Sequence, residues 1–300
     1  MVKIKSSLGT MTGKLDNLRL YERGGITIGS IYPSDAKNPR TEAQMKQRIK
    51  INNILDMYKC MKECLQTNFE GIIGNRNAAS LFRSHNLLQP PVWLTQSQKN
   101  HQECVLAPYV VSHGHLATIG CEYLDETFVS NINVKDLQLS DITVGDFVYY
   151  VRQYNDDWFH YDDLQIILLC QKIPDTVNSK LYVPAFWSFP FDMSNDNSRA
   201  LLSDALVCKT FNSSFRLRPC NIDGHLGIKV PEGTTSEFIY AFALVHGRGE
   251  GVKRMVSIQQ LCLSNTTLYD YYTGTEAMDA ALASYKTNRN RAFLDPGYHK

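Results

Sequence analysis

The residues best suited to chemistry lie together in the run Asp156-Asp157-Trp158-Phe159-His160-Tyr161-Asp162-Asp163. Paired carboxylates beside aromatic rings can bind a cation or a sugar, or act as an acid and a base. The same residue types also suit the polar tip of a hairpin. Because no partner motif stands elsewhere in the chain, the sequence favours the hairpin tip over a catalytic site.

Two histidines and two glycine-rich segments are the other chemical candidates. His113-Gly114-His115 could ligate a metal, but alternate residues of a strand point to opposite faces, so a structural or surface role is favoured. Gly9-Thr10-Met11-Thr12-Gly13-Lys14 resembles a phosphate loop whose glycines stand one residue too close, and Leu15 replaces the magnesium-binding hydroxyl. Gly247-Arg248-Gly249-Glu250-Gly251 lies between two strand-like runs, which favours a hairpin loop over a dinucleotide site. With no GxSxG, HExxH or catalytic Cys/His signature, we predict no enzyme activity, no metal site and no cofactor.

A long helix is the clearest structural signal. Pro39 disfavours helix at Asn38, and Thr41 then stands where an N-cap hydroxyl belongs, with Gln44 three residues later to complete a capping box. No Gly or Pro follows until Gly71, so the pattern predicts one helix of about 25 residues that begins near residue 42. A helix of this length has surface to offer to neighbouring molecules.

The remaining pattern predicts an α+β protein. Alternation from Leu15 to Ile31 around Arg23-Gly24-Gly25 predicts a hairpin. A second helix is predicted at 77–88, a polar connector at 95–103, and a closing helix at 275–287 before a polar, basic tail. Strand-like runs occupy 105–112, 115–119, 127–134, 144–154, 163–173, 181–189, 205–211, 215–218, 226–230, 237–246 and 252–263. Their turn-rich spacing predicts an antiparallel β-sandwich or barrel. We therefore predict a ribbon-and-helix module at 1–100 and a β-rich body at 101–300.

Composition and charge limit the protein's class and partners. The 300 residues are 43% hydrophobic and 20% charged, without a signal-like segment or an apolar run of about 18 residues, which predicts a soluble, unsecreted protein. Eight cysteines without a CxxC pair predict reduced, mostly buried thiols. Residues 1–50 hold ten Lys/Arg against four Asp/Glu, 51–285 hold 17 against 25, and 286–300 hold four against one. Such basic ends can steer an arm onto the acidic body of another copy, or onto nucleic acid.

Two resemblances add an expectation about assembly. Leu8-Gly9, Gly13-Lys14 and the segment from Lys37-Asn38-Pro39-Arg40 to Gln47-Arg48 resemble an uncharacterised family of gut bacteria and their tailed phages, which opens with LGxxxGK and continues NPRTxAQxxQR. The resemblance covers about residues 8–70, and 107–116 and 143–147 are similar to later strand segments of that family. Val245-His246-Gly247-Arg248, 254–261 and Ala283-Ser284-Tyr285 resemble segments of crass-like phage virion proteins. Both resemblances imply repeated assembly in a ring or shell, and neither implies an activity.

The resulting prediction is a non-enzymatic structural subunit of a tailed phage, in the tail or in the neck that joins the tail to the capsid. Its predicted partners are copies of itself and other virion proteins, DNA is a less favoured partner, and no membrane is expected. Its predicted location is the virion and, during assembly, the host cytoplasm. The ribbon of 8–32 would clasp a neighbour, and basic residues near the helix start would pair with its carboxylates. The interface candidates are Arg40, Thr41, Gln44, Arg48, Lys50, Asp156, Asp157, Asp162 and Asp163.

The sequence leaves two other functions open. The basic ends could serve a nucleic-acid-binding virion protein that lines a DNA channel or is packaged with the genome. A host-glycan-binding adhesin would use the aromatic residues, although aromatic residues in strands are more often part of a core. Its candidates are Trp158, Tyr161, Trp187, Phe189 and Phe191.

Overall fold

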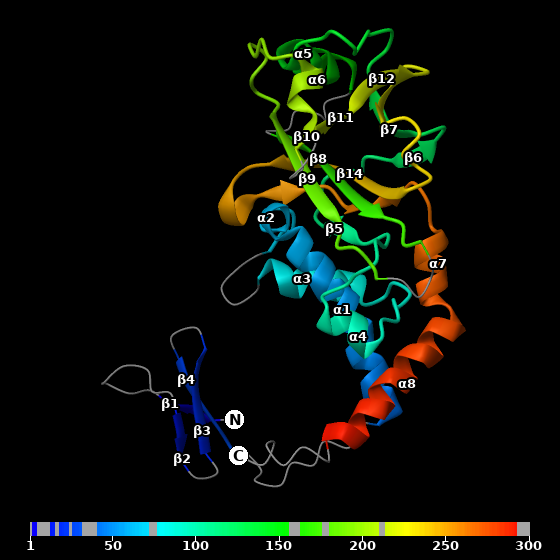
Figure 1. The fold of residues 1–300 in the computed structure, drawn as a ribbon. Helices are drawn as coiled ribbons and strands as arrows, with labels where there is room; N and C mark the ends of the chain where they lie inside the picture. Colours follow the sequence, from blue (N-terminus) through cyan, green and yellow to red (C-terminus); the bar gives the residue numbers. More distant parts are fainter. Residues whose placement is uncertain are drawn as a thin grey trace.

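The protein has the predicted α+β class, with helices and antiparallel sheets (Figure 1). The computed structural model describes residues 2–4, 13–15, 18–23, 26–31, 41–71, 77–155, 163–175, 180–209 and 214–292. Every ladder between its named strands is antiparallel. Across the part of the chain that it describes, no helix combines the length and apolar character needed to cross a bilayer.

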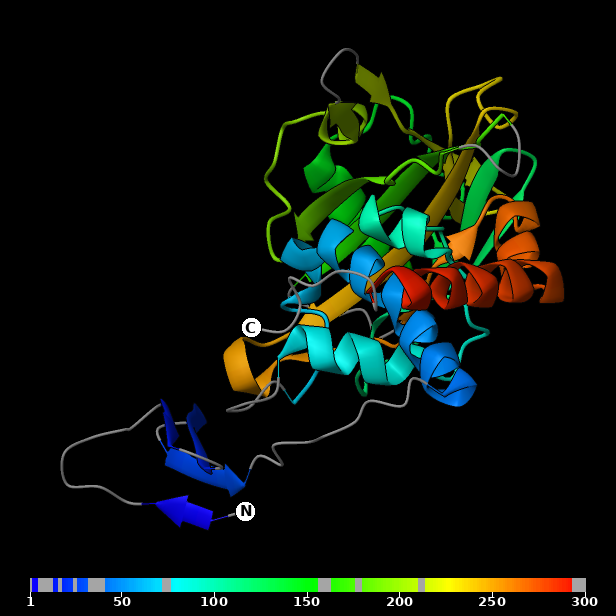
Figure 2. The ribbon, with the colours of Figure 1, turned by 60° about the horizontal axis from the view of Figure 1, so that its bottom comes forward.

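The N-terminus forms a small sheet of its own, drawn apart from the remaining elements in Figures 1 and 2. The predicted hairpin is confirmed, because Arg23 pairs with Ile26 at the closed end of its two strands. Two further strands complete the sheet in the order β1-β4-β3-β2. The strands are β1 (Val2–Ile4), β2 (Gly13–Leu15), β3 (Leu18–Arg23) and β4 (Ile26–Ile31).

The first helix, α1 (Glu42–Cys60), begins at the predicted residue with the predicted capping box. The Thr41 hydroxyl accepts from the Gln44 backbone at 3.4 Å, and the Gln44 side chain accepts from the Thr41 backbone at 3.3 Å. The helix is shorter than predicted, with 19 residues, and a single turn, α2 (Lys62–Leu65), follows it. Its second half is not free surface, because Ile54 and Met57 are buried against the chain's own body.

A central sheet divides the body into two cores. Its longest strands, β8 (Asp163–Lys172) and β14 (Phe238–Arg248), pair from Asp163–Gly247 to Lys172–Phe238. Alternate residues of both strands enter opposite cores, as the period of two in a strand requires. The sheet is completed by β9 (Ala185–Asp192), β15 (Met255–Val256) and β17 (Cys262–Leu263).

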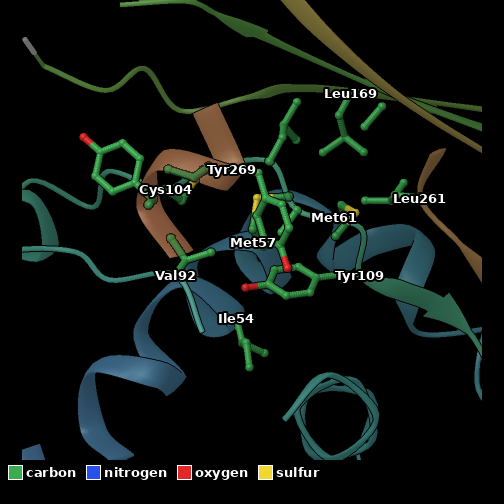
Figure 3. Close-up of a cluster of buried hydrophobic side chains, with 14 of the residues drawn as sticks. Ile54, Met57, Met61, Val92, Cys104, Tyr109, Leu169, Leu261 and Tyr269 are labelled. Atoms are coloured by element: carbon green, nitrogen blue, oxygen red, sulfur yellow. The ribbon is translucent and has the colours of Figure 1, made fainter. Parts of the chain in front are cut away.

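The first core lies between one face of this sheet and a layer of helices (Figure 3). Met57 and Phe82 come from before residue 100, while Tyr109, Leu169 and Tyr269 come from after it. Residue 100 therefore does not separate two cores, in contrast to the predicted division. The other elements of this layer are α3 (Ala78–Asn86), α4 (Gln96–Asn100), β5 (Val110–Ser112), which pairs with β16 (Gln259–Gln260), α7 (Thr267–Thr273) and α8 (Thr275–Ala292).

The second core lies between the other face of the central sheet and a second antiparallel sheet, so the β-rich, two-sheet character of the prediction holds. The second sheet has the order β12-β13-β7-β6. Its strands are β6 (Cys121–Leu124), β7 (Thr127–Asn133), β12 (Arg218–Ile222) and β13 (His225–Lys229). Two helices, α5 (Val144–Tyr154) and α6 (Leu202–Ala205), and the small pair β10 (Val207–Lys209) and β11 (Ser214–Arg216) complete this half.

Several predicted elements differ from the structure. The run 144–154 is the helix α5, not a strand, because the Thr143 hydroxyl caps it by accepting from the Asp146 backbone at 3.1 Å. The polar connector contains α4, whose start has a second capping box between Thr95 and Gln98. The run 252–263 is divided among the turn η2 (Gly251–Lys253) and three short strands. The glycine-rich run 247–251 does join two paired strands, β14 and β15, as predicted.

Candidate assembly surface

The N-terminal sheet presents two different faces. Residues that pair directly in an antiparallel ladder lie on the same face. Leu18 pairs with Ile31 on one face, whereas Arg19 pairs with Ser30 on the other. Ile31 is 81% exposed, and Leu18 is only half-buried. The first face therefore presents apolar surface that the described residues leave uncovered.

Within the two long strands, the rows of this first face hold Leu18, Leu20 and Ile31, together with Glu22. The rows of the other face hold the exposed Arg19, together with Tyr21 and the buried Ile28. Apolar residues therefore lie on both faces, and the most exposed large apolar side chain of the sheet is Ile31 on the first face.

The start of α1 is the exposed part of that helix. Thr41 and Gln44 satisfy each other in the capping box, and Lys46 pairs with Glu42 at 3.2 Å one turn away. Of the predicted interface cations, Arg48 is exposed and Lys50 is half-buried, while Arg40 lies outside the described residues. Arg48 is consequently the residue of this set with the most access to a neighbour.

The predicted acidic partners are only in part described. Asp156, Asp157 and Asp162 lie outside the described residues, as do Trp158 and Tyr161. Asp163 begins β8, and its two carboxylate oxygens accept from Arg254 at 2.6 and 2.9 Å. The prediction that Asp163 pairs with a neighbouring subunit is therefore replaced by an ion pair within the chain.

Arg254 itself was not singled out in the sequence. Its Nε also donates to the Thr67 carbonyl at 2.8 Å, so one guanidinium joins β8, the end of α2 and the loop after β14. The side chain of Arg254 is 18% exposed and that of Asp163 is 30% exposed. Because these partners are far apart in the chain, no local pattern in the sequence indicates this contact.

The histidine pair is part of a small cluster held together by Glu70. The Glu70 carboxylate accepts from the backbone amides of His115 at 2.9 Å and Val256 at 2.7 Å, and it also contacts the His115 ring. His113 stacks on His85, with 3.9 Å between the ring centroids. Burial, and then the neighbouring His113, lower the pKa of His85. These contacts hold loops together, and among the described residues no three His, Cys, Asp or Glu side chains gather to hold a metal ion.

A hollow of about 440 Å³ lies between α4 and the start of α8. Its wall includes Trp93, Tyr271, Tyr272, Glu103 and Gln98. Much of the polar lining is used within the chain, since Gln98 donates to the Tyr272 hydroxyl at 2.9 Å and Glu103 accepts from the Leu181 amide at 3.1 Å. Burial raises the pKa of Tyr272, which keeps that hydroxyl neutral. Gln98, Glu103 and Tyr272 are therefore engaged in contacts within the chain.

The adhesin candidates in the body are packed residues. Phe189 and Phe191 are buried in the second core, and Trp187 stacks edge-on against Phe215. This placement agrees with the core role that aromatic strand residues usually have.

Comparison with known proteins finds no relative of this chain. Neither a family model, nor a curated protein, nor a solved structure matches this chain. The resemblances to phage proteins therefore remain predictions.

Proposed function

We propose that this protein is a non-enzymatic structural subunit of a tailed phage particle, in the tail or in the neck, that assembles with copies of itself through its N-terminal sheet. One observation carries the proposal: a four-stranded sheet with an exposed apolar face stands apart from both cores of the body. Apolar surface that stays exposed on a folded protein marks a place where another surface can pack. This geometry supports the proposed assembly, and the resemblance supports the proposed phage particle.

Charge favours a second copy as the neighbour of the sheet. Residues 1–50 carry a net charge of +6, whereas residues 51–285 carry −8. The exposed Arg19 and Arg48 would be attracted to the acidic body of the next copy, while copies of the body repel one another. A contact between two different surfaces, repeated from copy to copy, forms a closed ring when the rotation between successive copies adds up to a full turn.

The direct test compares the mass in solution of the full chain with that of a variant lacking residues 1–35. We expect a multiple of the single-chain mass for the full chain and the single-chain mass for the deletion, by light scattering at low salt. Equal masses for the two proteins would refute the sheet as the assembly element.

A point substitution tests the apolar face itself. Ile31→Asp should dissociate the assembly, because Ile31 is 81% exposed and a carboxylate cannot be buried there without a large cost. Leu88→Asp is the matched control, since Leu88 is 93% exposed on the body and is not part of the sheet. If both variants keep the mass of the parent protein, the apolar face is not the contact.

A DNA-binding measurement distinguishes self-assembly from the alternative function of a nucleic-acid-binding virion protein. If the basic N-terminal residues serve DNA, the full chain should bind a duplex at low salt with an affinity that falls steeply as salt increases, and the deletion should bind much more weakly. The self-assembly proposal predicts salt-sensitive assembly in the absence of DNA.

A further inference from the structure

The hollow between α4 and the start of α8 has a buried carboxylate in its wall. The side chain of Glu103 lines the hollow and is only 7% exposed. Its Oε2 accepts from the Leu181 amide at 3.1 Å. An ionised carboxylate can accept at both oxygens, and burying it is costly unless its charge is compensated. The surroundings of the second oxygen, Oε1, therefore determine which ligand suits the hollow.

The neighbouring histidine does not satisfy this second oxygen. The Nδ1 atom of His101 is 4.0 Å from Oε1 of Glu103, which is too far for a hydrogen bond. The same Nδ1 lies 2.8 Å from the Ser97 carbonyl oxygen, and because a carbonyl only accepts, the proton on Nδ1 is directed there. Across the described part of the chain, Oε1 therefore has no hydrogen-bond donor.

Aromatic rings form another part of the wall. Trp93, Tyr271 and Tyr272 all line the hollow. The Trp93 amide donates to the Tyr272 carbonyl at 2.9 Å, which holds the segment before α4 against the end of α7. Tyr271 and Tyr272 meet edge to face, with 5.2 Å between the ring centroids. Since the faces of aromatic rings attract cations, the rings and the carboxylate favour the same kind of ligand.

One lysine in the wall opposes a cation only weakly. Lys180 also lines the hollow, but it is exposed, whereas Glu103 is buried. Water and salt screen a charge at the surface far more than a charge inside the protein. Within the described ranges, Lys180 forms no ion pair with Glu103. The buried negative charge therefore dominates the interior of the hollow.

We propose that this hollow is a binding site for an organic cation, a guanidinium or alkylammonium group, which pairs with Oε1 of Glu103 and packs its alkyl chain against Trp93 and Tyr271. The volume of about 440 Å³ falls within the range of about 300–1,000 Å³ that is typical of small-ligand sites. An anion would be repelled by Glu103, and a neutral ligand would leave the buried charge of Glu103 uncompensated.

Two sources can supply such a cation. One is a free small molecule. The other is an arginine or lysine side chain of the next copy, since residues 1–50 hold ten Lys/Arg. The contact with Glu103 has the same chemistry in both cases. The first source does not depend on the proposed assembly, whereas the second source rests on it, and the experiments below separate the two.

The first experiment measures the affinity of the full chain for two probes by titration calorimetry. The probes are N-acetyl-arginine amide and N-acetyl-citrulline amide, whose side chains have nearly the same shape and differ in charge. We expect the arginine probe to bind about tenfold more tightly or better, because a charge-assisted hydrogen bond is stronger than a neutral one. Equal affinities for the two probes, or no binding of the arginine probe, would overturn the proposal.

A substitution at the carboxylate tests the partner of the cation. Glu103→Gln should remove the preference for the arginine probe, because the amide oxygen still accepts from the Leu181 amide but the charge is lost. Glu276→Gln is the matched control, since Glu276 is exposed in the first turn of α8 and does not line the hollow. If Glu103→Gln keeps the preference of the parent protein, the cation does not bind at Glu103.

A second variant leaves the buried carboxylate in place and fills the hollow instead. Ala280 is exposed on α8 and lines the hollow, so Ala280→Arg should block binding of the arginine probe. Ala283→Arg is the control, because Ala283 is exposed on the same helix and does not line the hollow. Unchanged binding in Ala280→Arg would overturn the proposal even if Glu103→Gln fails to fold.

Light scattering of the same variants identifies the source of the cation. If a side chain of the next copy occupies the hollow, Glu103→Gln and Ala280→Arg should both lower the mass of the assembly. If a free small molecule occupies it, both variants should keep the mass of the parent protein and still lose the arginine probe. A full chain that has the single-chain mass would refute the proposed assembly alone, and the two probes would still decide the site in the hollow.

Discussion

At the scale of single residues, Asp163 forms its ion pair with Arg254 of the same chain. The sequence offered Asp163 as a partner for a neighbouring subunit, but both of its oxygens accept from Arg254. Asp163→Asn would leave the mostly buried Arg254 guanidinium without its countercharge. We expect a loss of about 1–3 kcal/mol in the free energy of unfolding and no change in assembly mass.

Urea unfolding and light scattering of the same samples measure both quantities. Asp136→Asn is the control, since Asp136 is an exposed loop carboxylate. Dissociation of the assembly without a loss of stability in Asp163→Asn would return Asp163 to an intersubunit role.

A buried histidine predicts how stability depends on pH. His246 lies fully buried in β14, and burial lowers its pKa from 6.5 to about 4. The unfolded chain therefore binds this proton at a higher pH than the folded chain, so stability is retained above pH 6.5 and lost as the pH falls toward 4. The expected loss from this group is about 3 kcal/mol.

The measurement compares urea unfolding at pH 7 and pH 4 for the parent protein and for His246→Leu. The variant should lose less stability on acidification, by about 2–3 kcal/mol. His101→Gln, an exposed histidine, is the control and should follow the parent protein. The same acid sensitivity in His246→Leu would contradict the assignment.

At the scale of elements, α5 depends on a glycine in its first turn. The Val144 and Gly145 amides donate to the Ala200 and Ser198 carbonyls at 2.8 and 3.0 Å, so the chain at 196–200 lies directly on the helix start. A Cβ at position 145 would stand 2.3 Å from the Asp196 carbonyl oxygen, which is backbone and cannot rotate away. Gly145→Ala should therefore destabilise the protein by about 2 kcal/mol, although alanine favours helix over glycine.

The matched control is Gly120→Ala, because a Cβ there would be in ordinary contact with Asn131 at 3.6 Å. Thermal unfolding of the two variants checks the prediction. Equal midpoints for Gly145→Ala and the parent protein would show that the segment at 196–200 can move.

At the scale of the whole molecule, the body should fold without the N-terminal sheet. Neither core contains a residue of β1–β4, since both draw on residues from Ile49 onward. Removing residues 1–35 should leave the midpoint of thermal unfolding of the body within about 2 °C, measured at high salt where assembly is weakened. A larger decrease would show that the sheet packs on its own body, and it would also remove the basis of the proposed assembly.

The sequence by itself determined the features that depend on residues close together in the chain. The capping box needs only Thr41 and Gln44, and the first hairpin needs only two alternating runs with glycines between them, so both were predictable. The α+β class followed from the same local patterns. Part of the candidate surface followed as well, because the exposed Arg48 lies on the first turns of the predicted helix.

Only the tertiary structure decided which of these surfaces is free. The pattern of α1 is that of a long helix, but its second half is covered by strands and helices distant in the sequence. Apolar residues in 144–154 suited either a strand or a helix, and contacts with residues 196–200 accompany the helix. The partner of Asp163, Arg254, is equally remote in the chain. Such contacts depend on how sheets and helices stack, which spacing along the sequence does not encode in any local pattern.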